Sequence, residues 1–176
     1  MKLRLFILIL TFICVVYLFA EEDSYNEKFL FVSVDTGYTI KGLLVGGIGV
    51  GAQVEVASFR YVGIAGNIGY FNAPYIFLNS YGGSLTFYPE GNGPYGYYIK
   101  VGCMYNIGQN TTNNVTQSGT LLTIPLQLGM KFVFDDLWGL TFDPYLEGEI
   151  YIGLDGYYEK VLTMYQSVGF RFGFTF

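Results

Sequence analysis

The chain has 176 residues, a length typical of one domain, and a net charge of −5 with a pI near 4.6. The acidic balance argues against a nucleic-acid partner, because nucleic-acid-binding domains carry basic patches. The sequence contains no His, which excludes Ser-His-Asp and Cys-His catalysis and all His-ligated metal sites. Charged residues make up 13%, aromatic residues make up 19%, and the 24 glycines complete a mixture that favours strands and tight turns over helices.

The N-terminus is typical of a secretory signal peptide over residues 1–20. Lys2 and Arg4 precede a continuous apolar run up to Ala20, and three acidic residues follow at once. A transmembrane anchor is the rival interpretation, but the run is shorter than the ~20 residues of a spanning helix. A lipoprotein site at Cys14 is disfavoured because the apolar run continues past it. Residues 21–28 then form a short N-terminal extension.

Removal of the signal peptide would change both the charge and the cysteine content. Without Lys2 and Arg4, seven basic residues face 14 acidic ones, for a net charge of −7. Cys103 would be the single remaining cysteine, so an internal disulfide is excluded. No cofactor is indicated.

Eight segments of the mature chain alternate large apolar residues with small or polar ones. This period of two predicts extended strands with unlike faces. The segments cover about residues 29–41, 48–58, 62–71, 80–88, 95–107, 121–134, 140–153 and 167–176.

The connections between these segments also alternate, in length. Residues 58–61, 89–94 and 135–139 are short turns, whereas the other connections are mostly longer: 42–47, 72–79, 108–120 and 154–160. The polar segment 109–119 is expected to be an exposed, mobile loop. Short turns at one end and longer loops at the other are the organisation of a bacterial outer-membrane barrel. The predicted fold is therefore all-β, a closed eight-stranded antiparallel up-and-down transmembrane β-barrel over residues 29–176, preceded by a signal-peptide helix.

The apolar face is expected to point outward, to lipid. The opposite face is crowded with Gly, Ala and Ser, and an eight-stranded barrel has room inside for little more than small side chains. Large aromatic residues gather at the strand ends, as in the two interfacial belts of membrane proteins. The belt at the short-turn end would hold Phe59, Tyr61, Phe87, Tyr95, Phe132, Phe134, Trp138, Phe142, Phe174 and Phe176. The belt at the long-loop end would hold Tyr38, Tyr70, Tyr75, Phe77, Tyr105, Tyr157 and Tyr158.

The last strand carries a recognisable pattern: a polar residue, a glycine and then spaced aromatics. These are Ser167, Gly169, Phe172, Phe174 and Phe176. With the signal peptide and the eight strands, they make the chain similar to the small eight-stranded outer-membrane β-barrel superfamily. The resemblance implies that these five residues form the assembly signal that the barrel-assembly machinery reads, and that the protein is located in the bacterial outer membrane.

The inward face carries one constellation of charges, a lumenal cluster of Asp35, Glu55, Lys100, Lys131, Glu147, Glu149 and Arg171. Arg171 is expected to pair with Asp35 and Glu147 on the neighbouring strands, and Lys100 and Lys131 are expected to meet Glu55 across the lumen. Buried charges are costly unless paired, so the cluster is interpreted as a salt-bridge plug.

These features predict an integral outer-membrane protein with a structural or surface-interaction role, whose longer loops meet an extracellular partner. One alternative is a narrow pore or small-solute transporter, in which Asp35, Glu55, Asp143, Glu147 and Glu149 would favour cations. A second alternative is a secreted, soluble barrel similar to lipocalins that holds a hydrophobic ligand. Catalysis by Glu147 and Glu149 as an acid/base pair is disfavoured, so the chain is not expected to be an enzyme.

Overall fold

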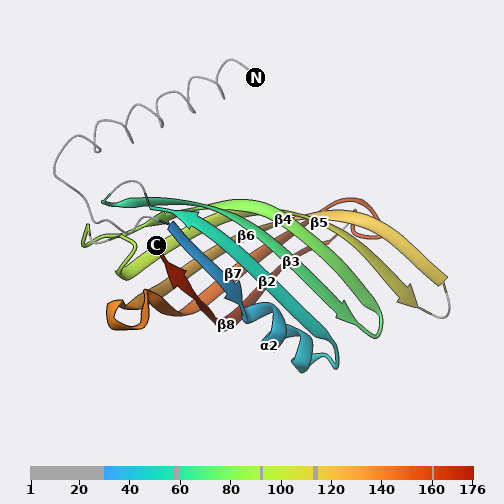
Figure 1. Cartoon of the computed structure of the whole chain (residues 1–176). Helices are drawn as coiled ribbons and strands as arrows, with labels where there is room; N and C mark the ends of the chain where they lie inside the picture. Colours follow the sequence, from blue (N-terminus) through green and yellow to red (C-terminus); the bar gives the residue numbers. More distant parts are fainter. Residues whose placement is uncertain (1–29, 58–59, 92, 113–114, 160) are drawn as a thin grey trace, which may run out of the picture.

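The computed structural model describes residues 30–57, 60–91, 93–112, 115–159 and 161–176 (Figure 1). The predicted signal peptide (1–20) and the extension (21–28) lie outside these residues. Within them the chain forms eight strands and two short helices: β1 (Leu30–Asp35), α2 (Gly37–Leu44), β2 (Ile48–Val56), β3 (Val62–Ala73), β4 (Ile76–Phe87), β5 (Gly96–Thr112), β6 (Val115–Phe134), η1 (Asp135–Leu137), β7 (Leu140–Gly156) and β8 (Leu162–Thr175).

Among the helices of these residues, none has both the length and the apolar character needed to cross a bilayer.

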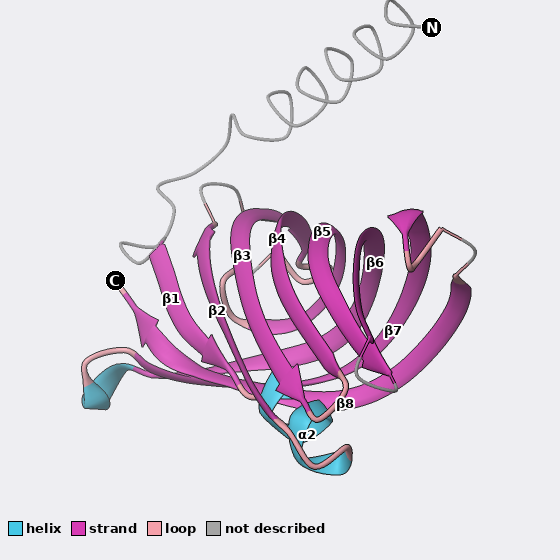
Figure 2. Ribbon diagram, turned by 90° about the vertical axis from the view of Figure 1, so that its right-hand side faces the viewer, coloured by secondary structure: helices cyan, strands magenta, loops and turns pink. Residues whose placement is uncertain are grey.

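The strands form one closed antiparallel barrel in the order β1 to β8, which confirms the predicted fold (Figures 1 and 2). Each strand pairs with the next along the chain, and β8 returns to pair with β1. At the closure, the backbone of Phe176 exchanges two hydrogen bonds with that of Leu30, at 2.8 and 3.1 Å. Trp138 and Gly139, both at positive φ, form the tight β6–β7 turn at the end where the closure lies.

The two faces of the wall differ as the alternation predicts. Large apolar side chains point outward and are exposed, for example Val34 on β1, Ile68 on β3 and Leu126 on β6, each more than half exposed. Polar and charged side chains point inward and are buried, among them Gln53, Glu55, Lys100, Lys131, Asp143 and Arg171, none more than 3% exposed. This polarity is the reverse of that of a soluble barrel.

The first strand is shorter than predicted. The alternation suggested a strand up to Lys41, but β1 ends at Asp35 and α2 begins at Gly37. The Asp35 carboxylate accepts a hydrogen bond from the Gly37 backbone N–H at 2.8 Å, and this local turn ends the strand. Tyr38 therefore does not belong to the predicted aromatic belt at the long-loop end. Its ring packs against Gly51 and Gly69 on the inner side of β2 and β3.

Two predicted loops are mostly strand. Residues 72–79 contain only the two-residue turn between β3 and β4, and residues 108–120 belong largely to β5 and β6. The strands of these β-hairpins pair up to Ala73–Ile76 and Thr112–Val115, so each hairpin is closed by a short connection and not by a long loop. Phe59 lies outside the described residues. Tyr158, also predicted in the belt at the long-loop end, is instead buried and lines the lumen.

Candidate functional site

The lumen is crossed by three groups of charged side chains, and Arg171 on β8 is the centre of the first. Its Nε donates to Asp35 Oδ2 at 3.0 Å and its Nη1 to Asp143 Oδ2 at 2.8 Å. The strand register explains both contacts, because Asp35 on β1 and Asp143 on β7 lie directly opposite Arg171. Gln127 accepts a further hydrogen bond from Nη2. The guanidinium carbon lies 4.2 Å from the centre of the Tyr145 ring, so the cation is enclosed on every side.

Glu55 on β2 is the centre of the second group, nearer the short-turn end. Lys100 and Lys131 each place Nζ 3.2 Å from Glu55 Oε2, and the side chain of Glu55 is fully buried. Gln53 donates to the same oxygen at 2.8 Å, while the Tyr88 hydroxyl donates to Oε1. Two cations and two neutral donors therefore surround one carboxylate.

Lys41 on α2 is the centre of the third group, which lies toward the other end of the lumen. Its Nζ is 2.7 Å from Glu147 Oε1 and 2.6 Å from Glu149 Oε2, both on β7. The Tyr151 hydroxyl also donates to Glu149 Oε2, at 2.8 Å. Lys41 therefore ties α2 to β7.

The observed pairs agree only in part with those expected from the sequence. The structure brings Lys100 and Lys131 to Glu55 and Arg171 to Asp35. It does not bring Arg171 to Glu147: Asp143 takes that place, and Glu147 binds Lys41 instead. Asp143 lies on the polar face of its strand, so the period of two places it in the lumen. Alternation does not contain the register that sets Asp143 opposite Arg171.

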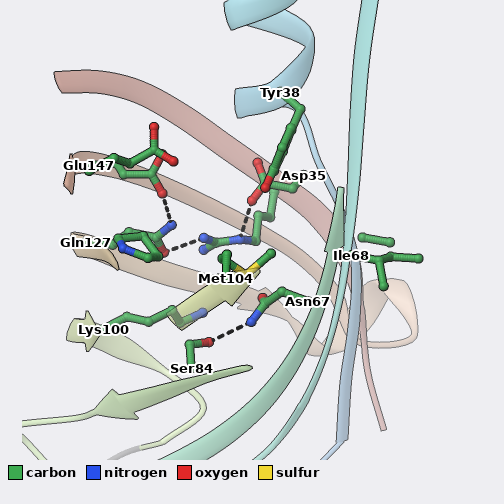
Figure 3. Close-up of a pocket in the computed structure, with 13 residues that line it drawn as sticks. Asp35, Tyr38, Asn67, Ile68, Ser84, Lys100, Met104, Gln127 and Glu147 are labelled. Carbon is green, nitrogen blue, oxygen red and sulfur yellow. Dashed lines mark hydrogen bonds and ion pairs between the residues drawn. The ribbon is translucent and has the colours of Figure 1, made fainter. Parts of the chain in front are cut away.

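Little space remains between these groups. A small cavity of about 30 Å³ lies among them, lined by Asp35, Lys100, Met104, Gln127, Glu147 and Arg171 among others (Figure 3). Arg171 is hydrogen-bonded to Gln127 and Asp35. Figure 3 shows Gln127 linked in turn to Glu147. Such a volume holds about one or two water molecules and no larger solute.

A second, larger cavity of about 420 Å³ opens beyond the Lys41 group. Its wall is mostly apolar and aromatic, with Leu78, Leu121, Tyr151 and Tyr158 among its residues. Lys41 and Glu149 also line this cavity, so their contact separates it from the charged interior. The volume falls within the ~300–1,000 Å³ range of small-molecule sites.

The residues of the expected assembly signal lie on β8 and just beyond it. Phe172, Phe174 and Phe176 are exposed on the outer face, at 44–59%. Ser167 and Gly169 face inward; the Ser167 hydroxyl donates to Glu147 Oε1 at 3.3 Å, and Gly169 lies against Gly37 at the start of α2.

Comparison with family models and with curated proteins gives no match. Among solved structures, the chain is similar to the N-terminal beta-barrel domain of OprF from Pseudomonas aeruginosa, with a TM-score of 0.58 and 15% sequence identity. The likeness covers 88% of this chain and 100% of that domain. At this identity it concerns the fold, and at that level it confirms the resemblance to small eight-stranded outer-membrane barrels that the sequence indicated.

Proposed function

We propose that the protein is an integral outer-membrane β-barrel with a plugged lumen and a structural or surface-interaction role. The observation that carries the proposal is the polarity of the wall. Ile64, Leu126 and Leu146 point outward at more than half exposure, while Arg171 and Glu55 are buried inside. In water such an outer face would be an apolar patch around the whole molecule, far beyond what soluble monomers expose. In a bilayer it is the face that a spanning barrel requires.

The lumenal ion pairs support a closed barrel rather than the alternative of a pore. Arg171, Lys100 and Lys131 are each within 3.2 Å of a carboxylate and nearly fully buried. A conducting path would have to separate these pairs, and unpairing a buried charge costs several kcal/mol. The exposed apolar outer face also disfavours the lipocalin-like alternative, since a soluble barrel points its large apolar side chains inward.

An enzymatic role is not part of the proposal. Glu147 and Glu149 lie two residues apart, as an acid/base pair would, but both bind Lys41. A carboxylate held in an ion pair is poorly placed to exchange a proton with a substrate. The interaction role instead rests on the hairpin tips, where Tyr75 between β3 and β4 is 68% exposed.

Detergent dependence and conductance test the proposal. The mature protein should require detergent or lipid to stay dispersed, and the folded barrel should migrate faster on a gel before heating than after it. Purified protein in a planar bilayer should show only rare, small openings. Solubility of the folded protein without detergent would contradict the membrane assignment, and large, stable openings would contradict the plug.

A further inference from the structure

The barrel wall has an opening between α2 and β8, in the half of the wall remote from the short turns. β1 pairs with β8 only from Phe31 to Asp35, opposite Thr175 to Arg171. Thr36 adds a last backbone bond to Phe170 O at 3.0 Å. Among the described residues, the stretch of β8 from Leu162 to Gly169 has no strand partner on this side, although each of its residues pairs with β7 on the other side.

Helix α2 takes the place of the missing half of β1 but covers only one side of the gap. Gly42 on α2 lies against the backbone of Ile48 and Gly49 on β2, and the Thr39 hydroxyl donates to Gly49 O at 2.7 Å. The helix therefore follows the edge of β2 (Figure 1). Its first residue, Gly37, contacts Gly169, but Leu162 and Met164 further along β8 are 75% and 65% exposed.

The 420 Å³ cavity reaches this opening. Most of its wall consists of inward-facing side chains, such as Leu121 and Thr123. Met164, however, points outward from β8 and still lines the cavity, as does Val45 at the end of α2 on the other side of the gap. The cavity therefore connects the lumen with the outer surface of the wall.

The opening lies at membrane depth. With a rise of ~3.3 Å per residue and a strand tilt of ~40°, the stretch from Phe174 to Met164 covers about the ~25 Å height of the apolar band of such barrels. The gap between Gly169 and Met164 is then in the half of this band remote from the short turns. A free strand edge is not tolerated in lipid unless something covers it.

The free edge of β8 needs a cover. The charge at the inner end of the cavity indicates which kind of ligand could supply it. One cation, Lys41, serves two carboxylates, Glu147 and Glu149, which leaves this group with a net charge of −1. Among the described residues, both hydrogen bonds of Glu149 end on Oε2, so Oε1 has no donor. Aromatic rings of Tyr38, Tyr151 and Tyr158 surround the same space and can face a cation.

We propose that this cavity binds a cationic amphiphile, an apolar chain or ring bearing one protonated amine, which enters from the bilayer through the gap between α2 and β8. The amine would be placed at Glu149 Oε1 and the apolar part along Leu78, Leu121 and Met164. The inference rests on the proposed membrane placement, but its binding test in detergent is separate. If the protein needs no detergent, the proposed function fails; if it needs detergent yet does not prefer the amine, only this inference fails.

A matched pair of fluorescent probes tests the ligand class. Dansylcadaverine carries an amine, and dansyl-6-aminohexanoic acid carries a carboxylate on a chain of similar length. The folded protein in non-ionic detergent should bind the amine at least tenfold more tightly. Glu149→Gln should remove this preference, whereas Glu90→Gln, at an exposed turn at the other end of the barrel, should leave it unchanged.

A second variant keeps the test decisive if Glu149→Gln fails to fold, which heat-dependent gel mobility would reveal. Thr163 lines the cavity on β8, and Thr163→Trp should fill the space and weaken binding of the amine at least fivefold without altering charge. Equal binding of both probes, or binding unchanged by Thr163→Trp, would overturn the proposal, since simple partition into the micelle would explain it.

The route of entry has its own test in phosphatidylcholine vesicles. Dodecylamine, which partitions into the bilayer, should displace dansylcadaverine from the reconstituted barrel. Ethylamine at the same concentration stays in water and should not displace it. Equal displacement by ethylamine would assign the cavity to water-borne cations and would overturn entry from the bilayer.

Discussion

Arg171 Nη1 lies 2.8 Å from Asp143 Oδ2, between residues that stand directly opposite each other on β8 and β7. The second oxygen of Asp143 accepts from the Tyr98 hydroxyl at 2.6 Å, and Arg171 is 1% exposed. The pair thus joins three strands through groups that have no access to solvent. The hydrogen bonds of the neighbouring Tyr98 and Asp35 side chains therefore depend on this pair staying in place.

Asp143→Asn is therefore expected to destabilise the barrel. The substitution leaves the buried guanidinium with one carboxylate, Asp35, and loss of one partner of a buried ion pair typically costs ~3–5 kcal/mol. We expect a loss near the lower end, about 3 kcal/mol, because Asp35 remains. Urea unfolding in detergent measures it. Asp136→Asn, in the exposed turn η1, is the matched control, and equal stability of the two variants would contradict the role of the pair.

Lys41→Met is expected to release α2 from β7. The substitution removes both contacts of the helix with β7 and leaves Glu147 and Glu149 as unpaired like charges. Backbone amides of α2 should exchange hydrogen faster by at least tenfold, while those of β3 and β4 should not change. Lys41→Arg keeps the charge and should restore slow exchange. Unchanged exchange in the methionine variant would show that packing against β2 alone holds the helix.

The sequence predicts the strands and their faces because a period of two is a local property. Val54 and Glu55 alternate on β2 whatever the neighbouring strands do, and each side chain has the predicted exposure. The end of β1 was not predictable in this way. Tyr38 and Ile40 continue the alternation, and what ends the strand is the hydrogen bond from Gly37 to the Asp35 side chain.

Contacts between strands require the register, which alternation does not contain. The sequence predicts a pair of Arg171 with Glu147, but the ladder of β7 and β8 sets Glu147 opposite Ser167 and Asp143 opposite Arg171. The lengths of the outer hairpins escaped prediction for another reason. Near the hairpin tip, residues such as Gln109 and Ser118 pair through the backbone, so the strands continue there without an apolar face.

Leu126→Arg tests which face meets lipid. Leu126 points outward from the middle of β6 and is 53% exposed. An arginine on the lipid face near the midplane of such barrels costs ~2–4 kcal/mol. Unfolding measured in lipid bilayers should show this loss, whereas Gln117→Arg, exposed near the outer end of the same strand, should change stability by less than ~1 kcal/mol. An equal, small effect at both positions would contradict burial of Leu126 in the bilayer.

Phe176→Ala should separate assembly from stability. The backbone of Phe176 closes the barrel by its bonds with Leu30, and these do not need the side chain. The ring is 59% exposed and packs only against Phe174 among the described aromatic pairs, with ring centres 6.4 Å apart. Refolding in detergent should therefore give a barrel close to the natural one in stability.

In cells the same variant should insert poorly, because the resemblance implies that the assembly machinery reads the aromatic side chains of β8. The fraction of folded barrel in the outer membrane, scored by heat-dependent gel mobility, measures this. Phe134→Ala removes a similar ring at the same end of the barrel, but from β6, and should insert normally. If both variants insert equally well, the terminal aromatic residue acts only as part of the lipid-facing surface.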